Sequence, residues 1–81
     1  MIRRVVSLES LGAAIKEARK IKGLTQAAAG KPVGIDQTTV SKVEQGGRGT
    51  RLDTLFRLLA ALDLELVLQP RQRPEDGRQV W

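Results

Sequence analysis

The fold is decided by residues 34–46, which read Gly34-Ile35-Asp36-Gln37-Thr38-Thr39-Val40-Ser41-Lys42-Val43-Glu44-Gln45-Gly46. Asp36 is placed to cap a helix over 37–45, because its side chain can accept a free N–H of the first turn. Val40 and Val43 are three residues apart and share the inner face of that helix. Their burial turns a polar set outward: Gln37, Thr38, Ser41, Lys42 and Gln45.

A second short helix is predicted immediately before this stretch. Thr25 can cap it, and it should run over residues 26–31 until Pro32 stops it, because proline cannot donate to the helical ladder. Gly34 then provides the turn into the next helix. Two short helices joined by a tight turn can place the second of them in the major groove of DNA.

A longer helix is predicted upstream, capped by Ser7 and ended by Gly23. One face of it is apolar, with Leu8, Leu11, Ile15 and Ala18 recurring at steps of three and four residues. Charged side chains are expected on its opposite, solvent-facing side: Lys16, Glu17, Arg19, Lys20 and Lys22.

A last helix is predicted downstream of the Gly46-Gly47 turn. We expect Thr50 to cap it and the helix to continue through Asp63. Its apolar stripe consists of Leu52, Leu55, Phe56, Leu59 and Leu62.

Both ends of the chain differ from the helical middle. Residues 1–7 form an arm or a short strand. Residues 64–69 alternate with a period near two, which indicates a strand, and Leu64, Leu66 and Leu68 line its apolar face. Such a strand has unpaired edges, which pairing with the same strand of a second copy would satisfy. Residues 70–81 are polar, contain proline and glycine, and are expected to form a flexible tail ending in Trp81.

Composition narrows the function classes. The chain has 81 residues, with 14 Lys and Arg against 9 Asp and Glu, for a formal charge of +5. That balance favours a polyanionic partner. Cysteine and histidine are absent, so we predict no disulfide, no metal site, no cofactor and no catalytic site. No stretch approaches a membrane span of about 20 apolar residues, and we predict a cytoplasmic protein that is not an enzyme.

The outward face of residues 37–45 predicts how bases would be read. The amide of Gln37 can pair with N6 and N7 of adenine, and Thr38 can contact thymine, a base edge or a phosphate. Ser41 allows close approach, and Lys42 can reach guanine or a phosphate. Phosphate contacts are predicted at the start of the preceding helix, from Thr25 and Gln26, and at the two ends of the loop that follows residues 37–45, from Arg48 and Arg51.

Three segments closely resemble the Cro/C1 (Xre) helix-turn-helix family of phage and bacterial repressors: Gly23-Leu24-Thr25-Gln26, residues 34–46, and Leu52-Asp53-Thr54-Leu55. The resemblance covers about residues 8–63. It implies an all-α, lambda-repressor-like domain of four to five helices that binds operator DNA, usually as a homodimer. In such a dimer the two recognition helices lie about 34–36 Å apart and read an inverted repeat.

A narrower resemblance, to HipB-type antitoxins, rests on the strand after the last helix, the charged tail and the terminal Trp81. It implies that residues 64–68, with Leu64, Leu66, Val67 and Leu68, pair across the dimer. It also implies a HipA-type kinase toxin as partner, contacted by Trp81, and repression of the chain's own operon. By position, Gln37, Thr38 and Ser41 would contact bases and Gln26 a phosphate.

The second helix departs from the family pattern. The positions after Thr25-Gln26 that usually hold a bulky aliphatic residue and alanine hold Ala29 and Gly30 here, with Pro32 close behind. We therefore expect this helix to be short, loosely packed or distorted.

Three functions remain open at this point. The first is an antitoxin that represses its own operon. The second is a stand-alone phage-type or metabolic repressor without a toxin. The third is a helix-turn-helix module that binds protein rather than DNA.

Overall fold

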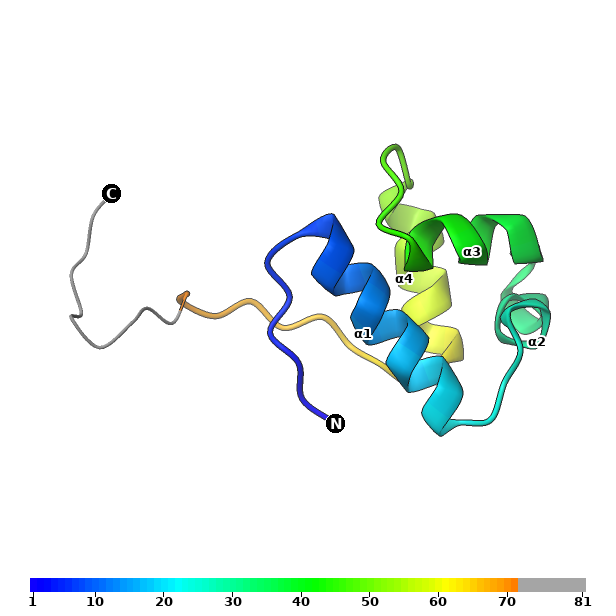
Figure 1. The fold of residues 1–81 in the computed structure, drawn as a ribbon, viewed down its shortest axis with the longest axis horizontal. Helices are drawn as coiled ribbons and strands as arrows, with labels where there is room; N and C mark the ends of the chain where they lie inside the picture. The colour runs from blue at the N-terminus through cyan, green and yellow to red at the C-terminus, as the bar shows by residue number, and fades with distance from the viewer. Residues whose placement is uncertain (72–81) are drawn as a thin grey trace.

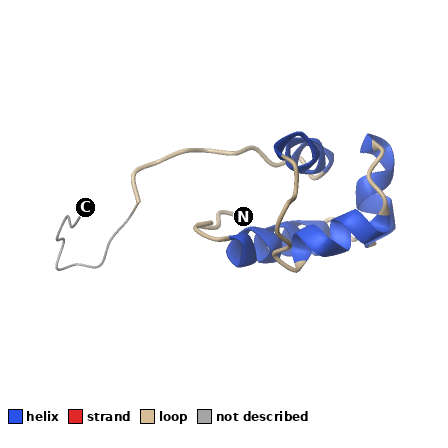
Figure 2. Ribbon diagram, turned by 90° about the horizontal axis from the view of Figure 1, so that it is seen from above, coloured by secondary structure: helices blue, strands red, loops and turns tan. Residues whose placement is uncertain are grey.

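The computed structural model describes residues 1–71, and within that range the chain is helical and contains no strand (Figures 1 and 2). Its elements are α1 (Leu8–Ile21), α2 (Gln26–Gly30), the 3₁₀ turn η1 (Lys31–Val33), α3 (Gln37–Glu44) and α4 (Leu52–Ala61). The predicted all-α fold is confirmed. None of these helices is long and apolar enough to cross a bilayer.

α1 begins and ends where its sequence predicts. Ser7 accepts a hydrogen bond from the Ser10 N–H at 3.0 Å, and the Ser10 hydroxyl accepts one from the Ser7 N–H at 2.9 Å. This reciprocal pair satisfies two donors at the helix start. At the other end Gly23 has a φ of 71°, and the Leu24 N–H donates to the Arg19 carbonyl at 3.1 Å, which closes the helix.

α2 is short, as predicted, but it is not loosely packed. Thr25 caps it through a 3.0 Å hydrogen bond from the Ala28 N–H. Ala29 is 1% exposed and Gly30 is buried. A Cβ on Gly30 would lie 2.2 Å from the carbonyl oxygen of Ile35. Glycine is therefore the residue that lets the turn fold back against its own helix.

Pro32 changes the helix type at this point. The α-helical ladder ends at Gly30, and the chain continues as η1 with Pro32 in its first turn. Proline lacks the N–H that the next α-helical bond would need, but its fixed φ suits the start of a helix. Gly34, with a φ of 71°, then reverses the chain toward α3.

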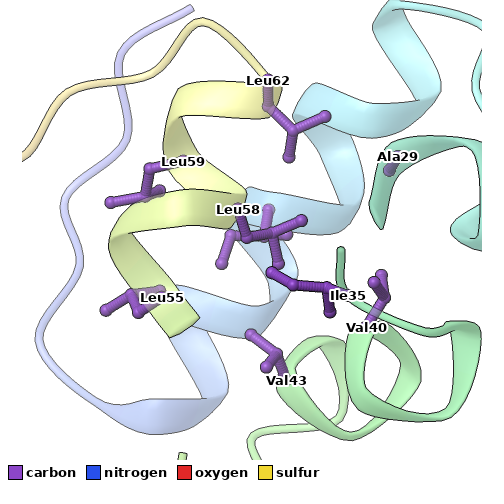
Figure 3. Close-up of a cluster of buried hydrophobic side chains, with 9 residues drawn as sticks. Ala29, Ile35, Val40, Val43, Leu55, Leu58, Leu59 and Leu62 are labelled. Carbon is purple, nitrogen blue, oxygen red and sulfur yellow. The ribbon is translucent and has the colours of Figure 1, made fainter. Parts of the chain in front are cut away.

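The core joins side chains from every helix (Figure 3). Ile15, Val40, Leu58 and Leu62 are its largest fully buried side chains. Full burial of one such side chain contributes about 1.5–3 kcal/mol. Ile35, in the turn before α3, is 6% exposed and packs in the same cluster. The predicted inward faces of Val40 and Val43 are confirmed, since these residues are 0% and 4% exposed.

α1 and α3 approach each other until their backbones nearly touch. Gly12 in α1 is buried, and a Cβ at this position would lie 2.4 Å from the carbonyl oxygen of Glu44. Real Cβ atoms do not come that close to a backbone oxygen. Gly12 therefore sets how near α3 sits to the body of the domain.

Two predictions for α4 are wrong. Thr50 does not cap it: Arg51 occupies the cap position without a side-chain bond, and the Thr50 hydroxyl donates to the Gly47 carbonyl at 3.4 Å. The buried stripe is also shifted. Leu52 and Phe56 are 70% and 49% exposed, whereas Leu58 is 0% exposed. The buried face is formed by Leu55, Leu58, Leu59 and Leu62, which pack in the core cluster with side chains from the other helices.

Residues 1–6 and 64–71, at the two ends of the described range, lie outside the helices. Residues 1–6 form a loop in which Arg3 pairs with Glu17 of α1. Residues 64–71 also form a loop, in which Leu64 packs on the core and Leu66, Val67 and Leu68 are exposed. One chain does not test pairing with a second copy, so the strand at 64–69 stays a prediction. Trp81 and the rest of residues 72–81 lie outside the described residues.

Candidate nucleic-acid interface

α3 displays its polar face to solvent. The Asp36 carboxylate caps it by accepting the Thr39 N–H at 2.8 Å, and this backbone hydrogen bond lowers the pKa of Asp36 below its ordinary value. Gln37, Thr38 and Lys42 are exposed. The helix therefore presents an amide, a hydroxyl and an ammonium group to one side while its valines hold it to the core.

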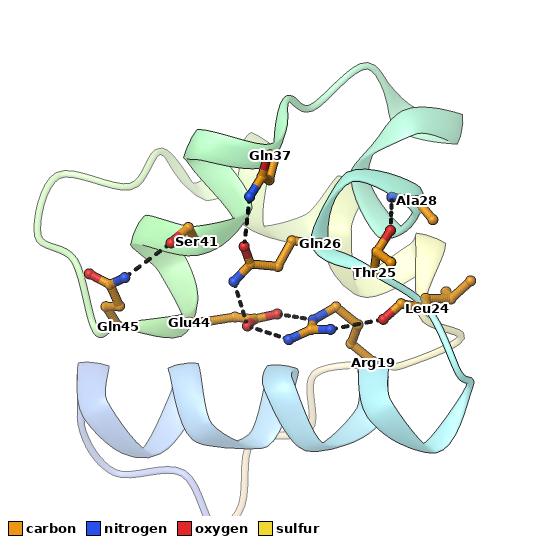
Figure 4. Close-up of polar contacts among 9 residues, drawn as sticks. All are labelled: Arg19, Leu24, Thr25, Gln26, Ala28, Gln37, Ser41, Glu44 and Gln45. Atoms are coloured by element: carbon orange, nitrogen blue, oxygen red, sulfur yellow. Dashed lines mark hydrogen bonds and ion pairs between the residues drawn. The ribbon is translucent and has the colours of Figure 1, made fainter.

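The first residues of α2 and α3 are joined by a hydrogen bond (Figure 4). The Gln37 Nε2 donates to the Gln26 Oε1 at 3.3 Å. Gln26 is half-buried and Gln37 is exposed. The residue predicted to read a base and a residue predicted to contact phosphate are thus brought into contact.

The remaining predicted base-contacting residues lie along the same helix. Ser41 is half-buried, and its hydroxyl accepts a hydrogen bond from the Gln45 Nε2 at 3.0 Å. Lys42 lies one residue further on and is exposed. Together with Gln37 and Thr38, these residues form one continuous polar surface, which we call the reading face.

The predicted phosphate-contacting residues belong to the segments on either side of α3: the start of α2, which adjoins α3 in Figure 1, and the loop that follows α3. Thr25 and Gln26 lie at the start of α2, beside the N-terminal end of α3. Arg48 and Arg51 are exposed beyond its C-terminal end. Arg51 also pairs with Asp53, with 3.2 Å between its Nε and the Asp53 Oδ1. The reading face therefore lies between two polar flanks, and the second is cationic.

Beneath the reading face lies a buried ion pair that the sequence analysis missed (Figure 4). The Arg19 Nε donates to the Glu44 Oε2 at 2.6 Å, and its second terminal nitrogen, NH2, donates to the Glu44 Oε1 at 3.0 Å. The two side chains are 10% and 2% exposed. The prediction that Arg19 faces solvent is wrong. Its position four residues after Ile15, on the apolar face, was the available signal.

Each member of the ion pair also forms a hydrogen bond at the start of the helix-turn-helix. The other terminal nitrogen of Arg19 donates to the Leu24 carbonyl at 2.8 Å, just before α2. The Gln26 Nε2 donates to the Glu44 Oε1 at 3.1 Å. α1, α2 and α3 are thereby joined through one polar cluster.

Electrostatics keep both members of the pair charged. Burial is the largest single influence on the pKa of Glu44 and would raise it. Hydrogen bonds from Arg19 and Gln26, together with the positive charges of Arg19 and Lys16, outweigh burial and hold this pKa below its usual value. The same contact with Glu44 raises the pKa of the Arg19 guanidinium. Glu44 is therefore a carboxylate, which accepts hydrogen bonds and donates none.

Comparison with known proteins agrees with this geometry. A helix-turn-helix family model matches residues 15–69. Antitoxin HipB of Escherichia coli is 35% identical over 66 residues, which are 82% of this chain and 75% of that protein. The chain belongs to the HipB antitoxin family. The predicted resemblances to the Cro/C1 family and to HipB are confirmed.

Solved structures of HipB complexes have the same fold as this HipB-family chain. A HipB-O4 20mer complex gives a TM-score of 0.81 at 32% identity, covering 88% of this chain and 100% of that one. A HipA-HipB-O2-O3 complex gives 0.80 at 32% identity with the same coverage. The restriction-modification controller protein C.AhdI from Aeromonas hydrophila gives 0.66 at 36% identity, covering 72% of this chain and 84% of that one. Antitoxins of this family are not enzymes, as predicted.

Proposed function

We propose that this protein is a sequence-specific DNA-binding repressor and the antitoxin of a HipBA-type system, working in the cytoplasm. One observation carries the proposal: α3 holds Gln37 outward at its first turn, hydrogen-bonded to Gln26 at the first turn of α2. In a helix-turn-helix, the N-terminal residues of the second helix are the ones that contact base edges in the major groove. The HipB relatives in complexes with operator DNA support it.

Gln37 reads adenine in this proposal. Its amide offers a donor to N7 and an acceptor to the N6 amino group, a bidentate pairing that favours adenine over other bases. Thr38 supplies a methyl group to thymine or a hydroxyl to a neighbouring base or phosphate. Ser41 keeps the helix close to the groove floor, and Lys42 reaches a guanine or a phosphate.

Phosphate contacts fix the register of the domain on DNA. Thr25 and Gln26 bind the backbone on one side of the groove, and Arg48 and Arg51 bind it on the other. These contacts carry little sequence information but supply most of the salt-dependent affinity. The formal charge of +5 acts in the same direction.

The binding form in this proposal is a homodimer. Leu66, Val67 and Leu68 are 51%, 65% and 90% exposed in the single chain. Pairing residues 64–69 with the same segment of a second copy would cover these side chains and satisfy the backbone groups. Leu64, packed on the core, would anchor that strand. Two reading faces about 34–36 Å apart would then match an inverted repeat.

The second partner is a HipA-type kinase toxin. The HipA-HipB complex among the structural neighbours supports this assignment. Trp81 is the proposed anchor, because tryptophan is favoured at protein interfaces. Deleting residues 78–81 should abolish capture of the kinase while leaving operator binding intact. A stand-alone repressor would capture no kinase even with residues 78–81 present.

The DNA-binding role is tested by Gln37→Ala, measured as the ratio of operator to scrambled-duplex affinity. We expect a loss of about 1–3 kcal/mol, confined to one base position of each half-site. Gln45→Ala, at the far end of the helix, is the matched control and should leave that position unchanged. Arg48→Ala should weaken both duplexes equally and reduce the salt slope by about 0.9. An unchanged ratio in Gln37→Ala would refute the base-reading role.

A further inference from the structure

We propose that Glu44, buried beneath the reading face, determines which base Gln37 selects by fixing the direction of a chain of hydrogen bonds. Glu44 contacts Gln26, and Gln26 contacts Gln37 (Figure 4). Glu44 is thus a positioning residue for specificity. This inference rests on the proposed DNA-reading function and goes beyond it.

The series of hydrogen bonds from Glu44 to Gln37 has one direction because its buried end is a carboxylate. A glutamine amide can turn over and exchange its oxygen with its nitrogen, so Gln26 alone would have no preferred orientation. The Glu44 Oε1 accepts and cannot donate, so it takes the Gln26 Nε2, at 3.1 Å. The Gln26 Oε1 is left facing Gln37 and accepts the Gln37 Nε2, at 3.3 Å.

The orientation of the Gln26 amide determines which hydrogen-bond donors and acceptors Gln37 has left for DNA. With one N–H donated to Gln26, Gln37 keeps one N–H and its carbonyl oxygen. Adenine presents one acceptor, N7, and one donor, N6, in the major groove. One donor and one acceptor on the side chain meet that pattern.

The opposite direction would favour guanine. If the Gln26 nitrogen faced Gln37, the Gln37 oxygen would turn toward Gln26 to accept from it, and the two N–H donors of Gln37 would face the groove. Guanine presents two acceptors, O6 and N7. The buried carboxylate of Glu44 therefore makes Gln37 prefer adenine over guanine without touching the DNA. It acts only through the direction of the hydrogen bonds.

Arg19 keeps the carboxylate in place. It holds both oxygens of Glu44, at 2.6 and 3.0 Å, and its remaining terminal nitrogen donates to the Leu24 carbonyl. The carboxylate is 2% exposed, so water has little room to replace Gln26. The packing of α1 against α2 and α3 thus fixes the direction of the hydrogen bonds from Glu44 to Gln37.

The test is selection from a random-sequence duplex library by the full-length protein and two variants. Glu44→Gln removes the obligate acceptor, and Gln26→Met removes the connecting amide while leaving the ion pair intact. In both we expect the adenine-to-guanine ratio at the Gln37 position to fall by about tenfold, within the discrimination one bidentate pair provides. Glu17→Gln, which removes a surface partner of an arginine, is the matched control and should leave the ratio unchanged.

A double variant distinguishes this role from a general structural one. In the Gln26→Met background, Glu44→Gln should lower the ratio no further, because the connection is already cut. Circular dichroism checks that each variant is folded during selection. If Glu44→Gln is unfolded, the Gln26→Met result decides, and an unchanged ratio there overturns the inference.

The outcomes separate this inference from the proposed function. A wild-type chain that enriches no sequence refutes DNA reading altogether. A wild-type chain that enriches adenine at one position, with variants that retain the same preference, refutes only the role of Glu44.

Discussion

At the scale of single residues, Gly30 shows how a turn can require the absence of a side chain. Its carbonyl accepts the Ile35 N–H at 3.0 Å, while a Cβ on Gly30 would come within 2.2 Å of the Ile35 oxygen. The chain after α2 therefore folds back over the position where the side chain would be. Helix propensity alone would favour alanine here by about 1 kcal/mol.

We predict that Gly30→Ala destabilises the protein by about 1–3 kcal/mol, because overpacking outweighs the gain in helix propensity. Urea unfolding measures the change. Ala27→Gly, at an exposed position of the same helix, serves as the control and should cost no more than about 1 kcal/mol. A Gly30→Ala protein more stable than the wild type would contradict the close approach.

Side-chain hydrogen bonds were mostly predictable where the two partners are close in sequence, as in helix caps. Ser7, Thr25 and Asp36 were predicted as caps from their own type and position, and all three accept the expected hydrogen bond. Thr50, predicted in the same way, does not cap α4. Arg19 and Glu44 were not predicted, because their pairing joins residues 25 apart in sequence. Periodicity assigns a charged side chain to solvent unless its partner on another helix is known.

At the scale of elements, α3 is held by three separate means. It is short, with eight residues, and an isolated helix of that length is unstable in water. Two buried valines pack it on the core, Asp36 caps its start, and Glu44 ties its last turn to α1. The recognition element therefore depends on the rest of the domain for its structure.

Asp36→Ala should lower the free energy of unfolding by about 0.5–2 kcal/mol, because the first turn of α3 loses its acceptor. Asp36→Asn keeps an oxygen at the same place and should retain most of the stability. Thermal unfolding of the two variants side by side measures the difference. Equal losses in both would show that the cap contributes through its charge rather than through the hydrogen bond.

The order of elements was predictable from sequence, but the orientation of α4 was not. Its apolar residues are numerous enough to define more than one stripe. The stripe that is buried is the one that packs in the common core with α1, α2 and α3, which leaves Leu52 and Phe56 outside. Which side of a strongly apolar helix faces inward is thus decided by its neighbours.

At the scale of the whole molecule, acid is expected to unfold the protein. Asp36, Glu44 and Asp63 each have a pKa below the ordinary value, the last through its hydrogen bond to Lys22. A carboxyl whose pKa is lower in the folded state adds stability above its unfolded pKa, and this is lost as pH falls through the folded value.

We therefore predict that the free energy of unfolding is nearly constant between about pH 6 and 8 and decreases below about pH 4. The sequence contains no histidine, so no side chain with an ordinary pKa near 6.5 is present. Urea unfolding across this range measures the profile. A loss of stability between pH 5 and 8 as pH rises would contradict it.

For the molecule as a whole, the reading face was predictable because it follows from one helix with two inward valines. The exposed side chains Gln37, Thr38 and Lys42 are displayed as that pattern predicts. Contacts between two copies of the protein were not predictable in the same way. Whether residues 64–69 form a strand depends on a second copy, which no property of a single chain reports.

The near contact of Gly12 with the backbone of α3 has an evolutionary consequence. The two helices can keep their present spacing only while position 12 carries no side chain. A larger residue in place of Gly12 would displace α3, and with it the polar surface that α3 presents. Descendants that come to bind a different operator are therefore expected to keep glycine at position 12 while the exposed side chains of α3 change.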